Sequence, residues 1–312
     1  ALQIALMALG VGRGDEIVTT PFTFIATAEA AALLGAEPVF VDIDPDTFNL
    51  DVDQVADALT ARTKAIVPVH LFGQPCDMDP LLEVADRHDI PVVEDCAQSI
   101  NARYNSRQTG SMGAIGCLSF FPSKNLGAFG DGGAVLARDE GIYRTMKSIA
   151  NHGAEKKYYH QRVGINSRLD AIQAAVLRVK LQHLDAYTEA RREAADRYDA
   201  LLGDLDAVTT PYRADNRHHV FHQYTIKVNG SSGSRTRNAL SDHLDARDIP
   251  HAVYYPKPLH HLPVFEQMSD NVPTLPVAER CSDQVLSLPM HTELTAEQHE
   301  TVADAIKQFF GS

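Results

Sequence analysis

The sequence predicts an α/β protein with a mostly parallel sheet covered by helices on both faces, followed by a smaller α/β domain. Short apolar segments alternate with helical patterns through the first half of the chain. With 312 residues, of which 44% are hydrophobic and 22% charged, the chain is long enough for these two domains. We place a large domain at residues 1–186, and a connecting helix and small domain at residues 187–312.

The first half repeats a cycle of short buried strand, loop and helix. The helical pattern at residues 1–10 has no N-cap and no initiator Met, and we expect residues that precede it to be absent here. Such a sheet binds its ligand beyond the carboxyl ends of its strands, so chemistry is expected just after each apolar run. Strands are predicted at residues 17–19, 37–42, 65–70, 90–94, 114–120 and 134–137, with further helices at 26–34 and 81–88.

The second half carries a longer helical region and further strands. Ser167 and Asp170 fit a capping box that opens a helix with apolar residues at helical spacing, including Ile172 and Val179. A highly charged stretch from Tyr187 predicts a long exposed helix that joins the two domains. Beyond it we predict a strand at residues 222–228, a turn at 230–233, a helix at 234–246, an extended segment at 251–258 and a helix at 294–310.

Composition and charge exclude several classes of function. Twenty-eight basic and 41 acidic residues give a net charge of -13, which argues against binding to nucleic acid or an anionic membrane. No apolar run reaches the roughly 18 residues of a membrane span. Four widely spaced cysteines without a CxxC pair indicate reduced, mostly buried thiols in a cytoplasmic protein. His218, His219 and His222 lack an acidic partner and precede a strand, so we expect no metal site.

Residues 119–133 form the stretch around which the chain is organised. One lysine, Lys124, and four glycines lie there between two apolar runs. This density of glycine predicts a loop whose backbone turns tightly beside a ligand. Burial behind two phenylalanines and a proline would favour the neutral amine, which is a nucleophile toward a carbonyl group. The alternative is a surface lysine on a phosphate-cradling loop, although Lys124 precedes the glycines, unlike the lysine of a Walker A loop.

Asp95 is the second candidate, because it directly follows the apolar run at residues 91–94, and Gln98 comes three residues later. Taken alone, Asp95 is more simply explained as the cap of the next helix. Together with Lys124, however, it forms the carboxylate–lysine pair that pyridoxal phosphate chemistry uses. The lysine would form a Schiff base, and the carboxylate would keep the pyridine nitrogen protonated.

Other residues meet the remaining needs of such a cofactor. Phe24 follows a strand end and could stack on the ring, although the core is the commoner place for an aromatic residue. Ser119 could bind a phosphate or bond its own backbone. Asn166 and Arg168 lie beside a predicted helix N-terminus, which favours anions, although Arg168 could also be a solvated residue of the first turn.

Five motifs together resemble the sugar-nucleotide aminotransferases of the DegT/StrS family. These are pyridoxal phosphate enzymes of fold type I, similar to aspartate aminotransferase, with a mostly parallel central sheet between helices and a smaller C-terminal α/β domain. The resemblance implies that Lys124 is the Schiff-base lysine and Asp95 the partner of the pyridinium nitrogen. The motifs lie at residues 93–98, 119–124, 130–133, 151–153 and 166–170.

The same resemblance implies roles for the other candidates. Gln98 would contact the cofactor near its ring, Phe24 would stack on the ring, and Ser119 would bind the phosphate. Asn166 would reach across the interface of an obligate homodimer to the phosphate held by the other subunit.

Within the family, the chain resembles most a subgroup that aminates UDP-2-acetamido-2-deoxy-3-oxo-glucuronate, with L-glutamate as donor, for surface polysaccharides. The segments that carry this resemblance are 2–4, 7–12, 163–170 and 255–259. It implies that Arg168 faces the substrate across the subunit boundary, where its guanidinium would suit a carboxylate or a diphosphate. Tyr255 would line the same pocket.

The chain departs from the family in one respect. The family has a phosphate-binding turn before the helix that opens this chain, and we expect that segment to be omitted here.

Three alternative functions remain. The first is an aminotransferase for another 3- or 4-keto sugar linked to dTDP, UDP or GDP. A pyridoxamine phosphate-dependent sugar dehydratase is the second, but related dehydratases carry His at the position of Lys124. A non-catalytic protein that binds phosphate or a nucleotide is the third.

Overall fold

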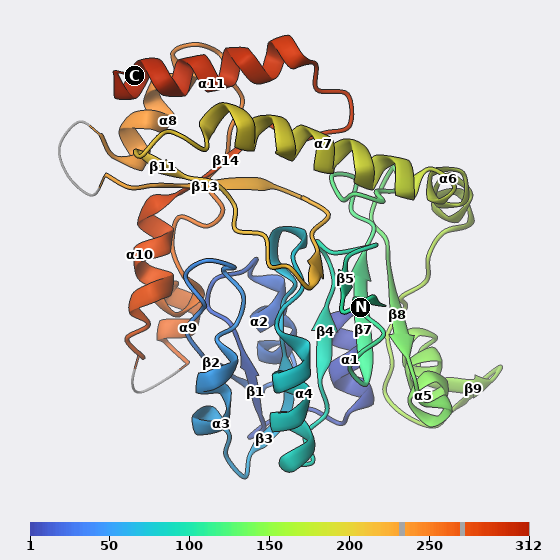
Figure 1. Cartoon of the computed structure of the whole chain (residues 1–312). Helices are drawn as coiled ribbons and strands as arrows, with labels where there is room; N and C mark the ends of the chain where they lie inside the picture. Colours follow the sequence, from blue (N-terminus) through green and yellow to red (C-terminus); the bar gives the residue numbers. More distant parts are fainter. Residues whose placement is uncertain (231–234, 269–271, 312) are drawn as a thin grey trace.

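A computed structural model describes residues 1–230, 235–268 and 272–311 of the chain (Figure 1). A helix-covered sheet from the first half of the chain lies next to a smaller sheet, over which the last helix and a long central helix run (Figure 1). Of the turn predicted at residues 230–233, all but Gly230 lies outside the described residues, as does residue 234, the start of a predicted helix.

The central sheet consists of two three-stranded parts, β2-β1-β3 and β4-β7-β8. Parallel bridges from Ile66 to Val92 and from Val69 to Asp95 join the two parts between β3 and β4. β8 pairs antiparallel with β7, while the other pairs in this sheet are parallel, which confirms the prediction of a mostly parallel sheet. The strands are β1 (Glu16–Thr19), β2 (Glu37–Phe40), β3 (Thr63–Val67), β4 (Val93–Asp95), β7 (Ile115–Ser119) and β8 (Gly133–Ala137).

Helices cover both faces of this sheet because alternate strand residues point to opposite sides. Ile17 packs in one apolar cluster with Met146 of α5 (Glu140–Ala150) and with residues of α1 (Leu2–Ala8). Its neighbour Val18 packs in another cluster with Leu81 of α4 (Met78–Arg87). Strands buried on both sides are continuous apolar runs, and this is why the sequence pattern located them.

The smaller sheet is antiparallel and consists of β11 (Val208–Thr209), β13 (Tyr224–Val228) and β14 (Val285–Leu288). It shares one apolar cluster with α7 (Leu184–Leu202), α8 (Arg237–Asp245) and α11 (Ala296–Phe310). The prediction that the long helix is exposed is wrong for one face of α7. Tyr198 is fully buried there, with its ring centroid 4.9 Å from that of Tyr224, because the charged residues of α7 lie mainly on its other faces.

The predicted capping box at Ser167 is also wrong. α6 (Ala171–Leu181) begins after Asp170, whose side chain makes no capping hydrogen bond. The backbone N–H of Ser167 instead donates to the carbonyl of Ala150, so residue 167 belongs to a segment that runs along the end of α5. The helical spacing is correct, but Ile172 and Val179 are 75% and 63% exposed in the single chain.

A helix from the C-terminal part is tied to the central sheet. The carboxylate of Asp42, which follows β2, accepts hydrogen bonds from the backbone N–H groups of Val277 and Ala278 at the start of α10 (Pro276–Gln284). All four cysteines are free and buried, as predicted. No helix in the described parts of the chain is long and apolar enough to cross a membrane.

The remaining elements are short or lie in the connections. They are α2 (Ala26–Ala32), α3 (Val55–Ala58), α9 (Pro263–Glu266), the 3-10 helices η1 (Val52–Gln54), η2 (Leu71–Gly73) and η3 (Leu259–His261), and the strands β5 (Arg103–Tyr104), β6 (Arg107–Gln108), β9 (Ala154–Lys156), β10 (Tyr159–His160) and β12 (Arg217–His218).

Candidate active site

The carboxyl ends of neighbouring strands bring the first candidate residues to one edge of the central sheet. Asp95 is the last residue of β4 and pairs with Cys117 of β7, and Ser119 is the last residue of β7. Lys124 lies in the loop that follows β7. This is the edge at which α/β sheets bind ligands.

Asp95 is buried and its carboxylate is held by two donors. One oxygen, Oδ1, accepts the backbone N–H of Ala97 at 3.0 Å, and Oδ2 accepts the hydroxyl of Thr27 at 2.8 Å. Residues 96–102 form turns, so the interpretation of Asp95 as a helix cap is wrong. Thr27 was not anticipated, because no sequence pattern links a threonine in α2 to a carboxylate 68 residues away.

Lys124 is half-buried, and its charge interacts with that of Asp95. Burial lowers the pKa of the Lys124 amine, and the nearby Asp95 carboxylate partly offsets this by favouring the ammonium form. The loop beyond it is closely packed, since a Cβ on Gly127 would lie 2.3 Å from the carbonyl oxygen of Pro122. Lys180 of α6 donates to the Gly127 carbonyl at 2.5 Å, so α6 holds this glycine-rich loop in place.

Gln98 and Tyr255 complete the buried group around Asp95. The side-chain amide of Gln98 donates to the Tyr255 hydroxyl at 3.2 Å, and its carbonyl accepts the backbone N–H of Phe72 at 2.6 Å. Burial is the main cause that raises the pKa of Tyr255, and the charge of Asp95 raises it further. Tyr255 therefore stays protonated and lies close enough to Asp95 to sense its charge.

His222 also lies close enough to Lys124 to sense its charge. Its position in the sequence suggested only a metal ligand, so its place beside Lys124 was not predicted. Its Nδ1 atom is 3.1 Å from the side-chain oxygen of Asn125. An amide oxygen only accepts, so Nδ1 carries the hydrogen and Nε2 keeps a lone pair. The pKa of His222 is held well below its ordinary value by burial first and by the charges of Lys124 and Arg191 next.

The other candidates make no described hydrogen bond to Asp95 or Lys124 in the single chain. Phe24 is 58% exposed, so it is no core residue, and it follows β1 at the same sheet edge. Ser119 accepts the backbone N–H of Phe121 at 3.3 Å, the local bond considered as an alternative, and its hydroxyl hydrogen stays available to donate. Asn166 and Arg168 are exposed on the segment before α6.

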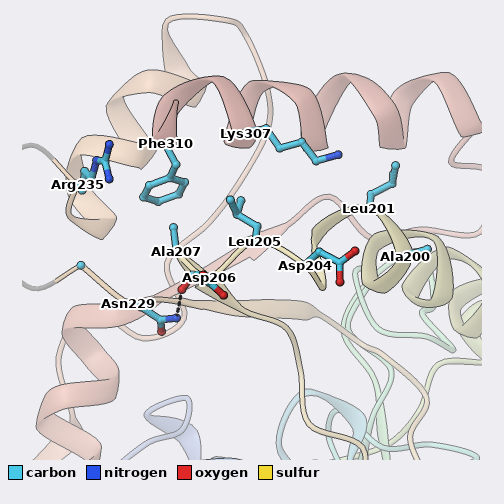
Figure 2. A pocket seen from close by; sticks show the side chains of 11 residues that line it. Ala200, Leu201, Asp204, Leu205, Asp206, Ala207, Asn229, Arg235, Lys307 and Phe310 are labelled. Carbon is cyan, nitrogen blue, oxygen red and sulfur yellow. Dashed lines mark hydrogen bonds between the residues drawn. The ribbon is translucent and has the colours of Figure 1, made fainter. Parts of the chain in front are cut away.

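A large cavity lies elsewhere in the molecule. It has a volume of about 640 Å³ and lies in the C-terminal part. Figure 2 shows its lining residues, among them Leu201 of α7 and Lys307 of α11. Asn229 donates to the carbonyl of Asp206 beside it. None of the candidate residues is among its described lining residues, so this cavity is separate from the group around Asp95 and Lys124.

Solved aminotransferases share this fold. The structure of DesV from Streptomyces venezuelae in complex with a ketimine intermediate has a TM-score of 0.93 and 41% identity, and covers 99% of this chain and 81% of that one. The PLP-form of the putative sugar aminotransferase Spr1654 from Streptococcus pneumoniae has a TM-score of 0.91 and 26% identity, over 99% of this chain and 84% of that one. The fold is therefore that of the type I pyridoxal phosphate-dependent transferases.

The family follows from the sequence comparisons. The profile of the DegT/DnrJ/EryC1/StrS aminotransferase family matches residues 1–307. The chain belongs to this family and is a transaminase.

Three relatives show the range of names within the family. A pleiotropic regulatory protein from Geobacillus stearothermophilus is 49% identical over 99% of this chain and 82% of its own length. The UDP-N-acetyl-3-dehydro-alpha-D-glucosamine 3-aminotransferase of Acidithiobacillus ferrooxidans is 46% identical over 99% and 81%. The UDP-2-acetamido-2-deoxy-3-oxo-D-glucuronate aminotransferase of Pseudomonas aeruginosa is 44% identical over 88% and 74%.

Proposed function

We propose that this aminotransferase moves the amino group of L-glutamate to UDP-2-acetamido-2-deoxy-3-oxo-glucuronate, with pyridoxal phosphate as cofactor, in the biosynthesis of a surface polysaccharide. The observation that carries the chemistry is the half-buried Lys124 beside the buried carboxylate of Asp95. The substrate is supported by the name of the Pseudomonas aeruginosa relative and by the exposed guanidinium of Arg168.

The side chains at the sheet edge suit this cofactor. When bound, pyridoxal phosphate supplies a carbonyl that takes up amino groups and a ring that accepts electrons. Asp95, held by Thr27 and a backbone N–H, would keep the ring nitrogen protonated. Burial lowers the pKa of Lys124, which increases the fraction of neutral amine that can take a proton from the α-carbon of glutamate and return it.

The remaining candidates are assigned by their position. Phe24 is exposed at the sheet edge and would cover one face of the ring, while Ser119 would donate its hydroxyl to the phosphate. Gln98 and the Tyr255 hydroxyl to which it donates would border the ring and the substrate.

Asn166 and Arg168 are proposed to serve a second subunit. Both are exposed and lie beside the uncovered apolar residues Ile172 and Val179 of α6, a surface suited to a homodimer. In such a dimer Asn166 would reach the phosphate bound by the partner subunit. Arg168 would pair with the glucuronate carboxylate or the diphosphate through its two-pronged guanidinium.

We also propose the division into residues 1–186 and 187–312, and a cytoplasmic location. One apolar cluster is drawn entirely from residues 195–310, which supports a separate core for the second part. The four free cysteines support a reducing compartment.

A second substrate is favoured by a specific observation. The relative named for UDP-N-acetyl-3-dehydro-glucosamine is 46% identical over nearly the whole chain, and that sugar carries no carboxylate. The two substrates share the diphosphate and differ in the carboxylate, so they distinguish the two possible partners of Arg168. A sugar dehydratase is disfavoured by Lys124, and a non-catalytic binding protein would lack the visible absorbance of a lysine-bound cofactor.

The test is mass spectrometry of products from keto sugar nucleotides, in the UDP, dTDP and GDP series, incubated with the enzyme and glutamate. We expect amination of the 3-oxo-glucuronate nucleotide, and loss of both turnover and the imine absorbance in Lys124→Ala. With Arg168 paired to the carboxylate, Arg168→Gln should raise KM for the glucuronate by about tenfold or more, as for one lost charge-assisted pair, and leave KM for the glucosamine derivative unchanged. Equal effects on both sugars would reject the carboxylate contact, and turnover by Lys124→Ala would reject the mechanism.

A further inference from the structure

We propose that His260, His261 and Glu279 form a binding site for a divalent transition-metal ion, with zinc as the best fit. The two histidines end η3, and Glu279 lies in the first turn of α10. Their ligand atoms all lie within 4.8 Å of one another. The site is separate from Asp95 and Lys124 and does not depend on the substrate proposed above.

Two of the three distances between the ligand atoms match a tetrahedral ion. The Nε2 atoms of His260 and His261 lie 3.2 and 3.3 Å from the same Glu279 oxygen, Oε1. Ligands that bind zinc at about 2.0–2.1 Å in a tetrahedron lie about 3.3–3.4 Å apart. The two rings stand at 83° with centroids 4.2 Å apart, so their nitrogen atoms converge from different directions.

Hydrogen bonding alone explains this arrangement poorly. Oε1 of Glu279 also accepts the backbone N–H of Leu275 at 3.0 Å, so three nitrogen atoms surround one carboxylate oxygen. Such an oxygen has two lone pairs and serves at most two donors well. An ion between the two Nε2 atoms and the carboxylate would use the imidazole lone pairs and relieve this excess of donors.

In a second buried histidine–glutamate pair, His70 and Glu94, both ring nitrogens of the histidine have hydrogen-bond partners. In His70, Nδ1 accepts the backbone N–H of Cys76, so Nε2 carries the hydrogen that it donates to Glu94 and has no lone pair for an ion. The Nδ1 atom of His260 has no hydrogen-bond partner among the described residues, so no such contact fixes its tautomer. Without an ion, the contact of Nε2 with Oε1 of Glu279 places the hydrogen on Nε2; a bound ion would shift this hydrogen to Nδ1 and take the lone pair of Nε2.

Charge and access also fit a divalent ion. Two neutral imidazoles and one carboxylate leave a net charge of +1 on the complex, a balance that is common at zinc sites with an open position for water. The His260 side chain is 1% exposed, whereas those of His261 and Glu279 are 44% and 33% exposed. An ion can therefore enter from solvent while the buried ring anchors it.

A bound ion would cross-link two parts of the chain near the candidate active site. η3 contacts the loop that carries Phe24, since the backbone N–H of Leu259 donates to the carbonyl of Pro21 at 2.8 Å. α10 is held to the central sheet by Asp42. The ion would join these two segments and stabilise the folded protein against unfolding.

The test uses untagged holoenzyme, freed of metal with a chelator and then titrated with Zn²⁺ and with Co²⁺. We expect one Zn²⁺ per chain by equilibrium dialysis, the strong visible band of tetrahedral Co²⁺, and a higher Tm with Zn²⁺. His261→Ala should weaken Zn²⁺ binding by about tenfold or more. Glu279→Gln should weaken it too, while its side-chain carbonyl can still accept the Leu275 N–H.

The matched control is His291→Ala, another exposed histidine, which lies 3.5 Å from Glu293 outside the cluster. This variant should bind Zn²⁺ like the wild type. The proposal is overturned if no saturable equivalent binds, or if His261→Ala binds Zn²⁺ as tightly as His291→Ala. If the ion were instead held by the cofactor, both variants would bind Zn²⁺ equally tightly, because both keep the cofactor site.

Discussion

Thr27 offers a sharp test of how the site holds Asp95. Its buried hydroxyl donates to Oδ2 of Asp95 at 2.8 Å, and the other oxygen is held by a backbone N–H. Thr27→Val keeps the shape of the side chain and removes this donor, together with a longer contact of 3.4 Å to the hydroxyl of Thr23. A hydrogen bond to a charged group contributes about 1.5–3 kcal/mol, and about 1.4 kcal/mol corresponds to a factor of ten. If the bond is at full strength during turnover, we expect kcat to fall by about 10- to 100-fold.

The assay is the single-turnover reaction of the holoenzyme with glutamate, followed by visible absorbance, with cofactor affinity and urea unfolding measured in parallel. The control is Thr27→Ser, which keeps the hydroxyl and loses a buried methyl group at a stability cost of about 1 kcal/mol. We expect Thr27→Ser to lose about 1 kcal/mol of stability and keep most of its rate, whereas Thr27→Val should lose rate as well as stability, because the buried carboxylate of Asp95 then lacks one donor. The reasoning is refuted if Thr27→Val reacts as fast as the wild type, or if the two variants lose rate equally.

Three other predictions concern Lys124, Asp42 and His222. Burial lowers the pKa of Lys124, so the ammonium form destabilises the fold at every pH below its folded-state pKa, and the cost disappears as pH rises toward the unfolded value. Lys124→Met should therefore raise the Tm of the cofactor-free protein at pH 7 and less so at pH 10; an unchanged Tm would contradict this. Asp42→Ala removes the acceptor at the start of α10 and should lower the free energy of unfolding in urea by about 0.5–2 kcal/mol, with a smaller loss in Asp42→Asn. Because His222 stays neutral, His222→Gln should leave the shape of the pH profile of kcat/KM unchanged between about pH 6 and 8, the range of free histidine. An inflection that disappears in this variant would show that His222 titrates there.

The sequence determined the central sheet and the edge at which chemistry occurs. Strands buried on both faces are continuous apolar runs, so β1, β3 and β7 stood out without any knowledge of their neighbours. Because ligands bind beyond the carboxyl ends of parallel strands, Asp95 and Lys124 could be placed at one edge from their position in the chain alone. The motifs added the family, which the profile over residues 1–307 confirms.

Local sequence patterns were less informative about where helices begin and about what packs against them. Ser167 had the residue types of a capping box, yet the chain there runs along α5 and the helix begins at Ala171. The charge of α7 suggested exposure, but the spacing of Tyr198 and its apolar neighbours put one face against the small sheet. Helical spacing identifies the face of a helix that is apolar, but not the element or subunit that will cover it.

Only the tertiary structure decided which side chains meet. The contact from Thr27 to Asp95 spans 68 residues, and that from Gln98 to Tyr255 spans 157. Such pairs leave no trace in the spacing of a single sequence, because their distance depends on strand register and on how the connecting segments pack. His260, His261 and Glu279 were equally invisible, since the packing of α10, which Asp42 holds at its start, places the glutamate beside the histidines. The sequence thus determined which elements form and which edge is reactive, and packing between distant elements decided the environment of each functional group.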